Sequence, residues 1–192
     1  MPNSGHIEYI QMKNLYFSLI MGVLMLCTSC NSNEKQEIIR LVKEWRGKEI
    51  VLPESSVFTI QGKDTIDFNM DSMYKILVYV DSAGCTSCRL QLHKWKEFIT
   101  EVDSITHHSV QFLFYLTPKN VKEARYITRR DDFTYPMCID PENKINARNH
   151  FPIKDMFHTF LLDADNRVQV IGNPIHNSAV RELYLKTICK NP

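Results

Sequence analysis

Two kinds of apolar pattern divide the chain and predict its main elements. Residues 74–80 (YKILVYV) form a continuous apolar run rich in β-formers, which is typical of a strand buried on both faces, and residues 109–117 (SVQFLFYLT) form a second such run. Between them, residues 90–102 (LQLHKWKEFITEV) place their apolar side chains on one stripe at helical spacing, which predicts an amphipathic helix. The sequence therefore predicts a buried sheet covered by helices.

The shorter segments extend this prediction. The turn residues Ala164-Asp165-Asn166 indicate a hairpin between two late strands, and Gln61-Gly62-Lys63-Asp64 indicates an earlier one. The polar segment from about 141 to 155 is expected to be irregular. From residue 74 the predicted order is β-α-β-α-β-β-α, which is an α/β fold. The other predicted helices cover 34–48, 119–132 and 178–190, and the other predicted strands cover 49–52, 57–62, 65–70, 135–140, 158–163 and 167–172.

The amino-terminal segment has the features of an export signal. Residues 15–26 form an apolar run that is too short to span a bilayer, and it follows a positive start at Met12-Lys13. We therefore expect Met12 to be the true initiator and residues 1–11 to be an over-extended start. Small residues precede Cys30, and this arrangement resembles the lipobox of a bacterial lipoprotein, in which Cys30 would be diacylated. Cys27 stands where such signals usually carry an aliphatic residue, and an uncleaved anchor or an ordinary signal peptide are the alternatives.

This interpretation divides the chain and predicts its location. We expect a signal segment over 1–29, a tether over 30–34, a helix and strand extension over 35–73, and a main domain over 74–192. A lipid anchor holds a protein at a membrane surface without spanning it, so the protein is expected in the cell envelope, facing the periplasm or the exterior. The formal net charge is +1 and there is no basic run, which excludes nucleic acid as an expected partner.

The pair Cys85-Thr86-Ser87-Cys88 carries the candidate chemistry. It follows a predicted buried strand and opens a predicted helix, whose amino-terminal N–H groups and dipole stabilise a thiolate. Cys85 is therefore the expected nucleophile, and Cys88, one turn deeper and within disulfide reach, is the expected resolving thiol. A structural disulfide is the alternative. A zinc site is disfavoured, because His107-His108 are adjacent and there is no second Cys-x-x-Cys.

Two stretches carry a resemblance to a known family. ILVYVDSAGCTSC and HTFLLDADNRVQVIG resemble the thioredoxin fold, in particular the exported TlpA/ResA-like redoxins, over roughly residues 74–189. The resemblance implies a central mixed sheet flanked by helices and a membrane-tethered thiol–disulfide oxidoreductase that needs no metal or organic cofactor. It also implies a protein substrate that bears a disulfide or thiol. If the protein works as a reductase, it further implies a membrane protein that donates electrons.

The sequence departs from this family at three positions near the pair. The proline that usually opens the strand before TFL is replaced at Phe157 or His158, the buried acid by Tyr79, and the tryptophan by Gly84. Asp81 is a candidate replacement base, with a helix cap or a solvated loop acid as alternatives. His158 is a candidate to face the disulfide and titrate near neutrality, and a solvated strand histidine is its alternative.

Other residues leave further alternatives open. Thr86 and Ser87 between the cysteines are candidates for tuning the reduction potential. Cys138 is expected to be a small buried hydrophobe, and a Cys138–Cys189 disulfide is a second possibility. SAGCT also resembles the TPGCT of single-domain peroxiredoxins, with Ser82 at the hydroxyl position, which makes a thiol peroxidase the alternative enzyme. A binding lipoprotein that kept a redoxin fold without catalysis is the third hypothesis.

Overall fold

The computed structural model describes most of the chain and divides it into two compact units. The described residues are 12–14, 16–17, 33–66, 72–82 and 90–190. The first unit covers Met1–Glu44 and the second Trp45–Pro192. Residues 33–45 are helical, which confirms the predicted helix, and the helix ends before Gly47. Within the described part of the chain, no helix is both long and apolar enough to cross a membrane.

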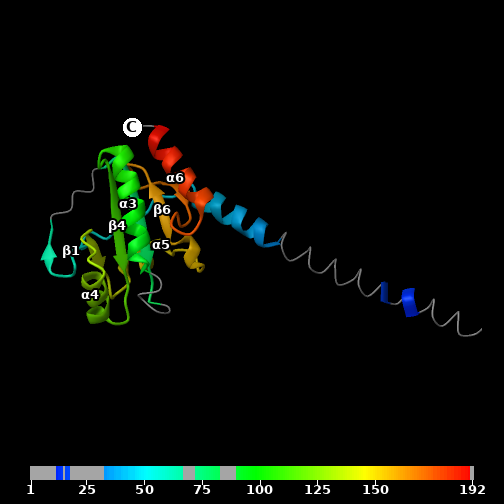
Figure 1. Cartoon of the computed structure of the whole chain (residues 1–192), viewed down its shortest axis with the longest axis horizontal. Coiled ribbons are helices and arrows are strands. Elements are labelled where there is room, and N and C mark those ends of the chain that lie inside the picture. The colour runs from blue at the N-terminus through cyan, green and yellow to red at the C-terminus, as the bar shows by residue number, and fades with distance from the viewer. Residues whose placement is uncertain (1–11, 15, 18–32, 67–71, 83–89, 191–192) are drawn as a thin grey trace, which may run out of the picture. The chain divides into compact units, whose positions relative to one another are not determined.

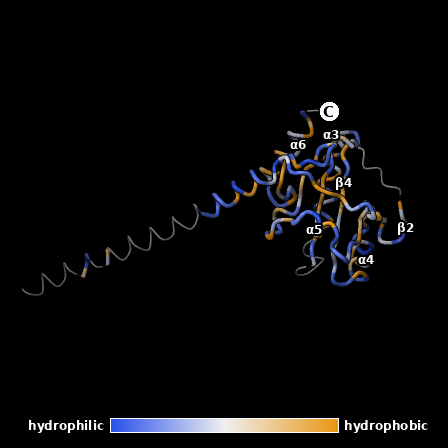
Figure 2. The backbone as a smooth tube through the Cα atoms, turned by 180° about the vertical axis from the view of Figure 1, so that it is seen from behind, coloured by the Kyte–Doolittle hydropathy of each residue, from blue (hydrophilic) through white to orange (hydrophobic). Residues whose placement is uncertain are grey.

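The second unit contains a mixed sheet of seven strands in the order β2-β1-β5-β4-β3-β6-β7. The central strands β3, β4 and β5 run parallel, while β6, β7 and β1 pair antiparallel to their neighbours. This arrangement confirms the predicted mixed sheet, and Figure 2 shows hydrophobic segments gathered in the strands at its centre. The strands are β1 (Phe58–Ile60), β2 (Asp64–Thr65), β3 (Tyr74–Val80), β4 (Val110–Leu116), β5 (Met137–Ile139), β6 (Thr159–Leu162) and β7 (Val168–Ile171).

Helices of the second unit flank this sheet (Figure 1). Every residue of β3 is buried, as its unbroken apolar run predicts, because the strand is covered on both faces. One face packs against α3 and α6, where Trp95, Phe98 and Tyr184 are part of the core. The helices are α3 (Leu92–Thr106), α4 (Val121–Arg130), α5 (Lys144–Asn149) and α6 (Ser178–Lys190), and Asp155–Phe157 form a short 3-10 helix, η1.

Aromatic side chains form the core on the other face of the sheet. The ring of Phe160 lies 5.3 Å from Trp45 and 5.1 Å from Phe151, and Phe151 lies 4.9 Å from Tyr79 (centroid distances). Such tilted aromatic pairs add about 0.5–1.5 kcal/mol each beyond the area they bury. Trp45 therefore joins the start of the second unit to the same core that holds Tyr79.

The segment after Trp45 lies along the outer edge of β7. Gly47 N donates to Val168 O at 2.7 Å, Val168 N donates to Lys48 O at 2.9 Å, and Ile50 N donates to Asn166 O at 2.9 Å. These bonds pair backbone groups that an edge strand would otherwise leave free for another chain. The segment after Trp45 thus covers this edge of the sheet.

Two predictions about local structure are wrong. Residues 49–52 were expected to form a strand, but only Glu49 forms a bridge, to Arg167, because Val51 instead bonds through both backbone groups to the Asn149 side chain (2.8 and 2.9 Å). The segment from 141 to 155 is not irregular throughout, since it contains α5 and the start of η1. The Asp140 carboxylate accepts the Ile145 N–H at 3.0 Å and so satisfies a free donor at the start of α5.

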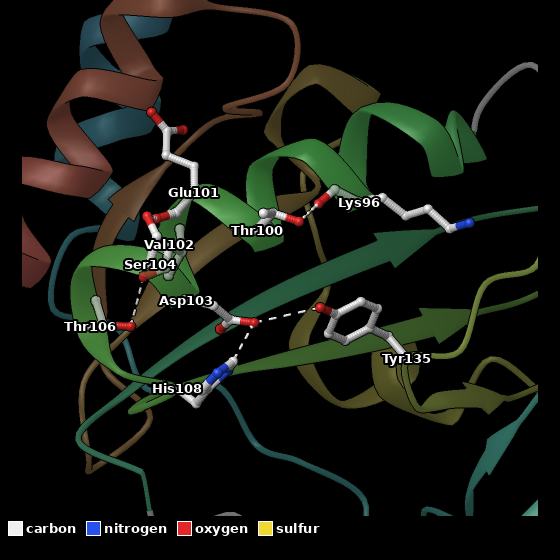
Figure 3. A network of polar contacts seen from close by, with 9 residues as sticks. All are labelled: Lys96, Thr100, Glu101, Val102, Asp103, Ser104, Thr106, His108 and Tyr135. Carbon is white, nitrogen blue, oxygen red and sulfur yellow. Dashed lines mark hydrogen bonds and ion pairs between the residues drawn. The ribbon is translucent and has the colours of Figure 1, made fainter.

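Helix α3 begins slightly later than its apolar pattern predicts. Gln91 has a left-handed backbone (φ 39°), so the regular helix starts at Leu92. Toward its other end, the Asp103 carboxylate accepts a hydrogen bond from the Tyr135 hydroxyl at 3.5 Å and lies 3.1 Å from His108 Nδ1 (Figure 3). The pKa of Tyr135 is raised, mainly by burial and then by the charge of Asp103. This group of polar contacts ties α3 to the segment before β5.

Candidate redox site at the carboxyl edge of the sheet

The predicted redox pair and its immediate neighbours lie outside the described residues. Cys85, Thr86, Ser87 and Cys88 fall in this gap with Gly84, and Cys30 falls in an earlier one. On either side of the pair, β3 ends at Val80 and α3 begins at Leu92. The chain order therefore assigns the pair to the connection between the carboxyl end of a central strand and the next helix.

Several described side chains gather where the parallel strands end, and we call this region the carboxyl edge. Backbone bonds continue the sheet just beyond the strands, from Thr117 N to Val80 O at 2.8 Å and from Asp140 N to Leu116 O at 2.7 Å. In open α/β sheets, ligands bind outside the carboxyl ends of the strands. The carboxyl edge is therefore the place to look for chemistry on this fold.

Tyr79 is the most buried candidate at this edge, with 3% of its surface exposed. Its hydroxyl donates to Asn143 Oδ1 at 3.0 Å, and the Thr117 hydroxyl donates to the same oxygen at 3.3 Å. Burial raises the pKa of Tyr79, and the nearby charges of Asp81 and Asp140 raise it further. The side chain is consequently a neutral phenol at physiological pH, and it cannot act as the base that the family's buried acid provides.

Two carboxylates lie near Tyr79 and differ in their environment. Asp81 is partly exposed at the end of β3, and its charge acts on the pKa of Tyr79. Gln91 holds the cap position of α3 as described, and the helix-cap alternative for Asp81 depends on residues 83–89, which lie outside the described part of the chain. Asp140 is buried and accepts a hydrogen bond from the backbone of α5. Of the two carboxylates, Asp81 is therefore the more exposed.

His158 lies beside Tyr79 and is 5% exposed, so the expectation of a solvated strand histidine is wrong. The two rings are 5.0 Å apart, and Tyr79 N donates to His158 O at 2.9 Å. His158 Nε2 is 2.7 Å from Pro152 O. Because a carbonyl oxygen only accepts, Nε2 must carry the proton, and in the neutral ring Nδ1 is then an acceptor. The ring thus presents a fixed tautomer beside Tyr79 at the carboxyl edge.

Sequence reasoning found three of these residues and missed their partners. Tyr79, Asp81 and His158 follow from their register to the cysteine pair. The structure packs the Tyr79 ring against His158, and the charge of Asp81 acts on the pKa of Tyr79. Asn143 and Thr117 were not among the candidates. The one available signal for Asn143 is that asparagine tolerates a left-handed backbone, which it adopts here (φ 55°) at the cap of α5.

The two remaining cysteines of the second unit are free thiols. Cys138 is buried as expected, and burial raises the pKa of its thiol to about 11. Cys189 is exposed near the end of α6. The possible Cys138–Cys189 disulfide is therefore not formed. Among the residues that the structure describes, no group of three or more His, Cys, Asp or Glu side chains is arranged to hold a metal ion.

Comparison with known proteins supports the fold but gives no family by sequence. No protein-family model matches the chain, and no curated protein does. A protein assigned as the thiol:disulfide interchange protein DsbE from Chlorobium tepidum is similar in structure, with a TM-score of 0.54, 14% identity, and coverage of 74% of this chain and 97% of that one. This chain has a thioredoxin-like fold.

Two other solved structures show the range of proteins that share this fold. A protein assigned as a protein disulfide isomerase from Bacteroides thetaiotaomicron matches with a TM-score of 0.53, 13% identity, and coverage of 74% of this chain and 89% of that one. A cysteine-to-serine variant of PrxQ from Xylella fastidiosa matches with a TM-score of 0.52, 14% identity, and coverage of 77% and 97%. Disulfide-exchange proteins and peroxiredoxins thus resemble the chain to the same degree.

Proposed function

We propose that the protein is a thiol–disulfide oxidoreductase of the cell envelope, held at a membrane by a lipid on Cys30. One observation supports this proposal: in the sequence, Cys-x-x-Cys lies between β3, a central strand of a thioredoxin-like sheet, and the helix α3 that follows it. That connection leads into a helix, and helix amino termini stabilise thiolates. No metal or organic cofactor is required.

The reaction transfers two electrons between the pair and a substrate protein. The Cys85 thiolate attacks one sulfur of the substrate disulfide, which breaks that bond, forms a mixed disulfide and releases a substrate thiolate. Cys88 then attacks Cys85 in the mixed disulfide, so that the pair becomes oxidised and the second substrate sulfur leaves as a thiolate. The reverse sequence oxidises a substrate dithiol. In the reducing direction, a membrane protein that donates electrons must restore the Cys85–Cys88 dithiol.

The described residues suggest how the thiols are assisted. Tyr79 is neutral, so proton transfer is assigned to the two other groups at the edge: Asp81, which is partly exposed, and His158, whose Nδ1 is an acceptor in the neutral ring. Thr86 and Ser87, between the cysteines, are assigned to tuning the reduction potential. The hydrogen bond from His158 Nε2 to Pro152 fixes the orientation that this role needs.

A thiol peroxidase is the second candidate, because peroxiredoxins are among the structures that share this fold. In that reaction the Cys85 thiolate attacks peroxide and becomes a sulfenic acid, while water or an alcohol leaves. Cys88 then condenses with the sulfenic acid to form the disulfide and releases water. This candidate differs from the first in its oxidant and in not needing a protein disulfide.

The reduction potential of the pair is the deciding measurement. The full chain is equilibrated with glutathione buffers, free thiols are trapped by alkylation, and each cysteine is counted by mass. Catalytic pairs fall between about −120 and −270 mV, whereas structural disulfides lie below about −300 mV. We expect a two-electron transition confined to Cys85 and Cys88 within the catalytic window, and Cys138 and Cys189 serve as internal controls.

Variants separate the candidates. Loss of insulin-disulfide reduction in Cys85→Ser, with activity retained in Cys189→Ser, supports the oxidoreductase. Peroxide consumption by Cys88→Ser with no exchange of protein disulfides would support the peroxidase instead. A pair that stays oxidised in every buffer, or that never oxidises, would leave a binding lipoprotein on a redoxin fold.

A further inference from the structure

Helix α4 presents a row of exposed cations that form no ion pair among the described residues. Lys122, Arg125 and Arg129 are exposed and follow the i, i+3, i+7 spacing of a single helix stripe. Tyr126 lies within the same stripe with 57% of its surface exposed. The ion pairs among the described residues include none of these three cations. We call Lys122, Arg125, Tyr126 and Arg129 the cationic face.

Three acidic residues lie near this face: Glu123 is exposed in the first turn of α4 itself, and the two that follow the helix are engaged elsewhere. Asp131 pairs with Arg130 at 2.6 Å, and Asp132 accepts a hydrogen bond from the Gln61 side chain at 3.2 Å. The pKa of Asp131 is lowered, first by its hydrogen bond from Arg130, so it stays ionised and committed to that partner. Glu123 is the one acid within α4, so it offsets the three cations only in part and the face keeps a net positive charge.

Arg125 is held in place by its packing. A Cβ atom built on Gly62 would lie 2.5 Å from Arg125 Cγ, so the arginine side chain lies directly over the β1–β2 turn. Gly62 has a left-handed backbone (φ 69°), as the turn requires. The aliphatic part of Arg125 thus packs against the backbone of Gly62, and this packing holds the side chain in the absence of a partner.

The start of α3 adds to the same charge. Its first turn contains no acidic residue, although the helix dipole favours acids there, and it carries His93 and Lys94. Lys96 lies in the next turn, and its side chain points away from the Asp103 carboxylate (Figure 3). Lys96 Nζ instead donates to Asp131 O at 2.8 Å and so joins the start of α3 to the end of α4.

The cationic face adjoins the carboxyl edge. Helix α4 begins directly after the Thr117–Asn120 connection that follows β4, so it starts at the edge where the parallel strands end (Figure 1). The contact of Lys96 with the end of α4 brings this helix beside the first turns of α3, the helix that follows the cysteine pair. A molecule bound on the cationic face would therefore lie beside the first turns of α3.

We propose that the cationic face docks an acidic segment of the protein whose disulfide or dithiol reacts with Cys85 and Cys88. This inference rests on the proposed function and names the class of partner. Complementary charge steers encounter and raises association rates, and it disfavours basic competitors. A protein segment is favoured over a lipid surface because the charge lies beside the first turns of α3, the helix that follows the cysteine pair in sequence.

The test compares disulfide peptides that differ only in the residues flanking the cysteines: Asp and Glu in one, Asn and Gln in the second, Lys in the third. The reduced full chain is mixed with each, and the rate of exchange is followed by acid quenching and mass analysis. We expect the acidic peptide to react about 10-fold faster than the neutral one at low salt, in line with electrostatic steering. This advantage falls as ionic strength rises, since surface charges are screened.

Two variants of equal charge change make the test specific. Lys122→Glu/Arg129→Glu alters exposed cations of the cationic face, and Lys186→Glu/Lys190→Glu alters exposed cations of α6, whose end lies near the start of β3. We expect the first variant to lose the acidic preference and the second to keep it. Equal urea midpoints for both variants and the parent chain establish that folding is intact.

The outcomes of these experiments distinguish a failure of the docking proposal from a failure of the proposed oxidoreductase function. If glutathione disulfide reacts normally but the three peptides react at equal rates, the docking proposal is overturned and the oxidoreductase stands. If no disulfide reacts, both are overturned. If the peptides react equally, and phosphatidylglycerol in proteoliposomes protects the α4 amides from hydrogen exchange, the face binds lipid and the protein partner is ruled out.

Discussion

Replacing Tyr79 with phenylalanine tests the polar contacts at the carboxyl edge with little change in shape. The substitution removes one hydroxyl from a side chain that is 3% exposed. It breaks the bond to Asn143 Oδ1 at 3.0 Å but leaves that oxygen with the Thr117 hydroxyl at 3.3 Å. The aromatic ring and its contacts with Phe151 and His158 remain.

The expected magnitude follows from these contacts. A hydrogen bond between neutral groups contributes about 0.5–1.5 kcal/mol net, and a larger loss arises only when a buried partner is left without a donor. Asn143 keeps one donor, so Tyr79→Phe should lower the free energy of unfolding by about 1 kcal/mol. For a domain of this size that corresponds to a fall in Tm of roughly 2–4 °C.

Urea unfolding of the full chain measures this change, with Tyr126→Phe as a matched control. Tyr126 is 57% exposed on α4, so its substitution should alter the free energy by less than about 0.5 kcal/mol. An unchanged m value for both variants shows that the transition remains comparable. The two variants remove the same atom, and only its surroundings differ.

A double variant sharpens the result. Thr117→Val removes the second donor to Asn143 Oδ1, so the pair Tyr79→Phe/Thr117→Val leaves that oxygen with neither hydroxyl. The double variant should therefore cost more than the sum of the single variants by about 0.5 kcal/mol or more. Strict additivity, or a Tyr79→Phe effect no larger than that of Tyr126→Phe, would refute the shared-acceptor arrangement.

Three further predictions concern the remaining fold. Gly62→Ala should lower the Tm of the protein more than Gly47→Ala does, because both glycines have positive φ but only the new methyl at Gly62 meets another side chain. Calorimetry measures both values, and equal falls in Tm would contradict this. With iodoacetamide at pH 8, native Cys138 should react at least about 100-fold more slowly than Cys189, since its thiol has a pKa of about 11 and is buried; peptide mapping that finds similar rates would count against it. Burial raises the pKa of Tyr184 well above 10, so above pH 10 the native state keeps a proton that the unfolded chain loses. The contribution of this group to the free energy of unfolding is complete below pH 10 and falls above it by about 1.4 kcal/mol per pH unit. Urea midpoints measured across this range test the assignment, and an equal pH dependence in Tyr184→Phe would argue against it.

The parts of the fold that were predictable from sequence are those with strong, local hydrophobic patterns. The run at 74–80 coincides with β3, and the apolar positions of 178–190 coincide with α6. The pattern at 90–102 found α3 but could not show that Gln91 takes a left-handed conformation, which moves the start of the helix. Periodicity reports burial, and it does not report the dihedral angles of a single residue.

The missed elements depend on contacts between distant residues. Asn149 bonds to the backbone of Val51, and this side-chain contact takes the place of a strand ladder that the apolar residues 49–52 suggested. At the site, Tyr79 and His158 could be inferred from register alone. Asn143 could not, because its bond to Tyr79 spans 64 positions and exists only once α5 has formed beside the sheet.

The backbone bonds between the Gly47–Ile50 segment and the start of β7 also determine how the protein responds to force. A chain held at its amino-terminal side transmits any pull into the second unit through Trp45, and the next groups to carry that load are the bonds to Val168 and Asn166. Trp45 is packed on Phe160 and Phe151, so it must leave the aromatic core before those bonds are stripped. Tension would therefore open the β7 edge first, while β3, which β6 separates from β7 in the sheet, stays folded together with the carboxyl edge.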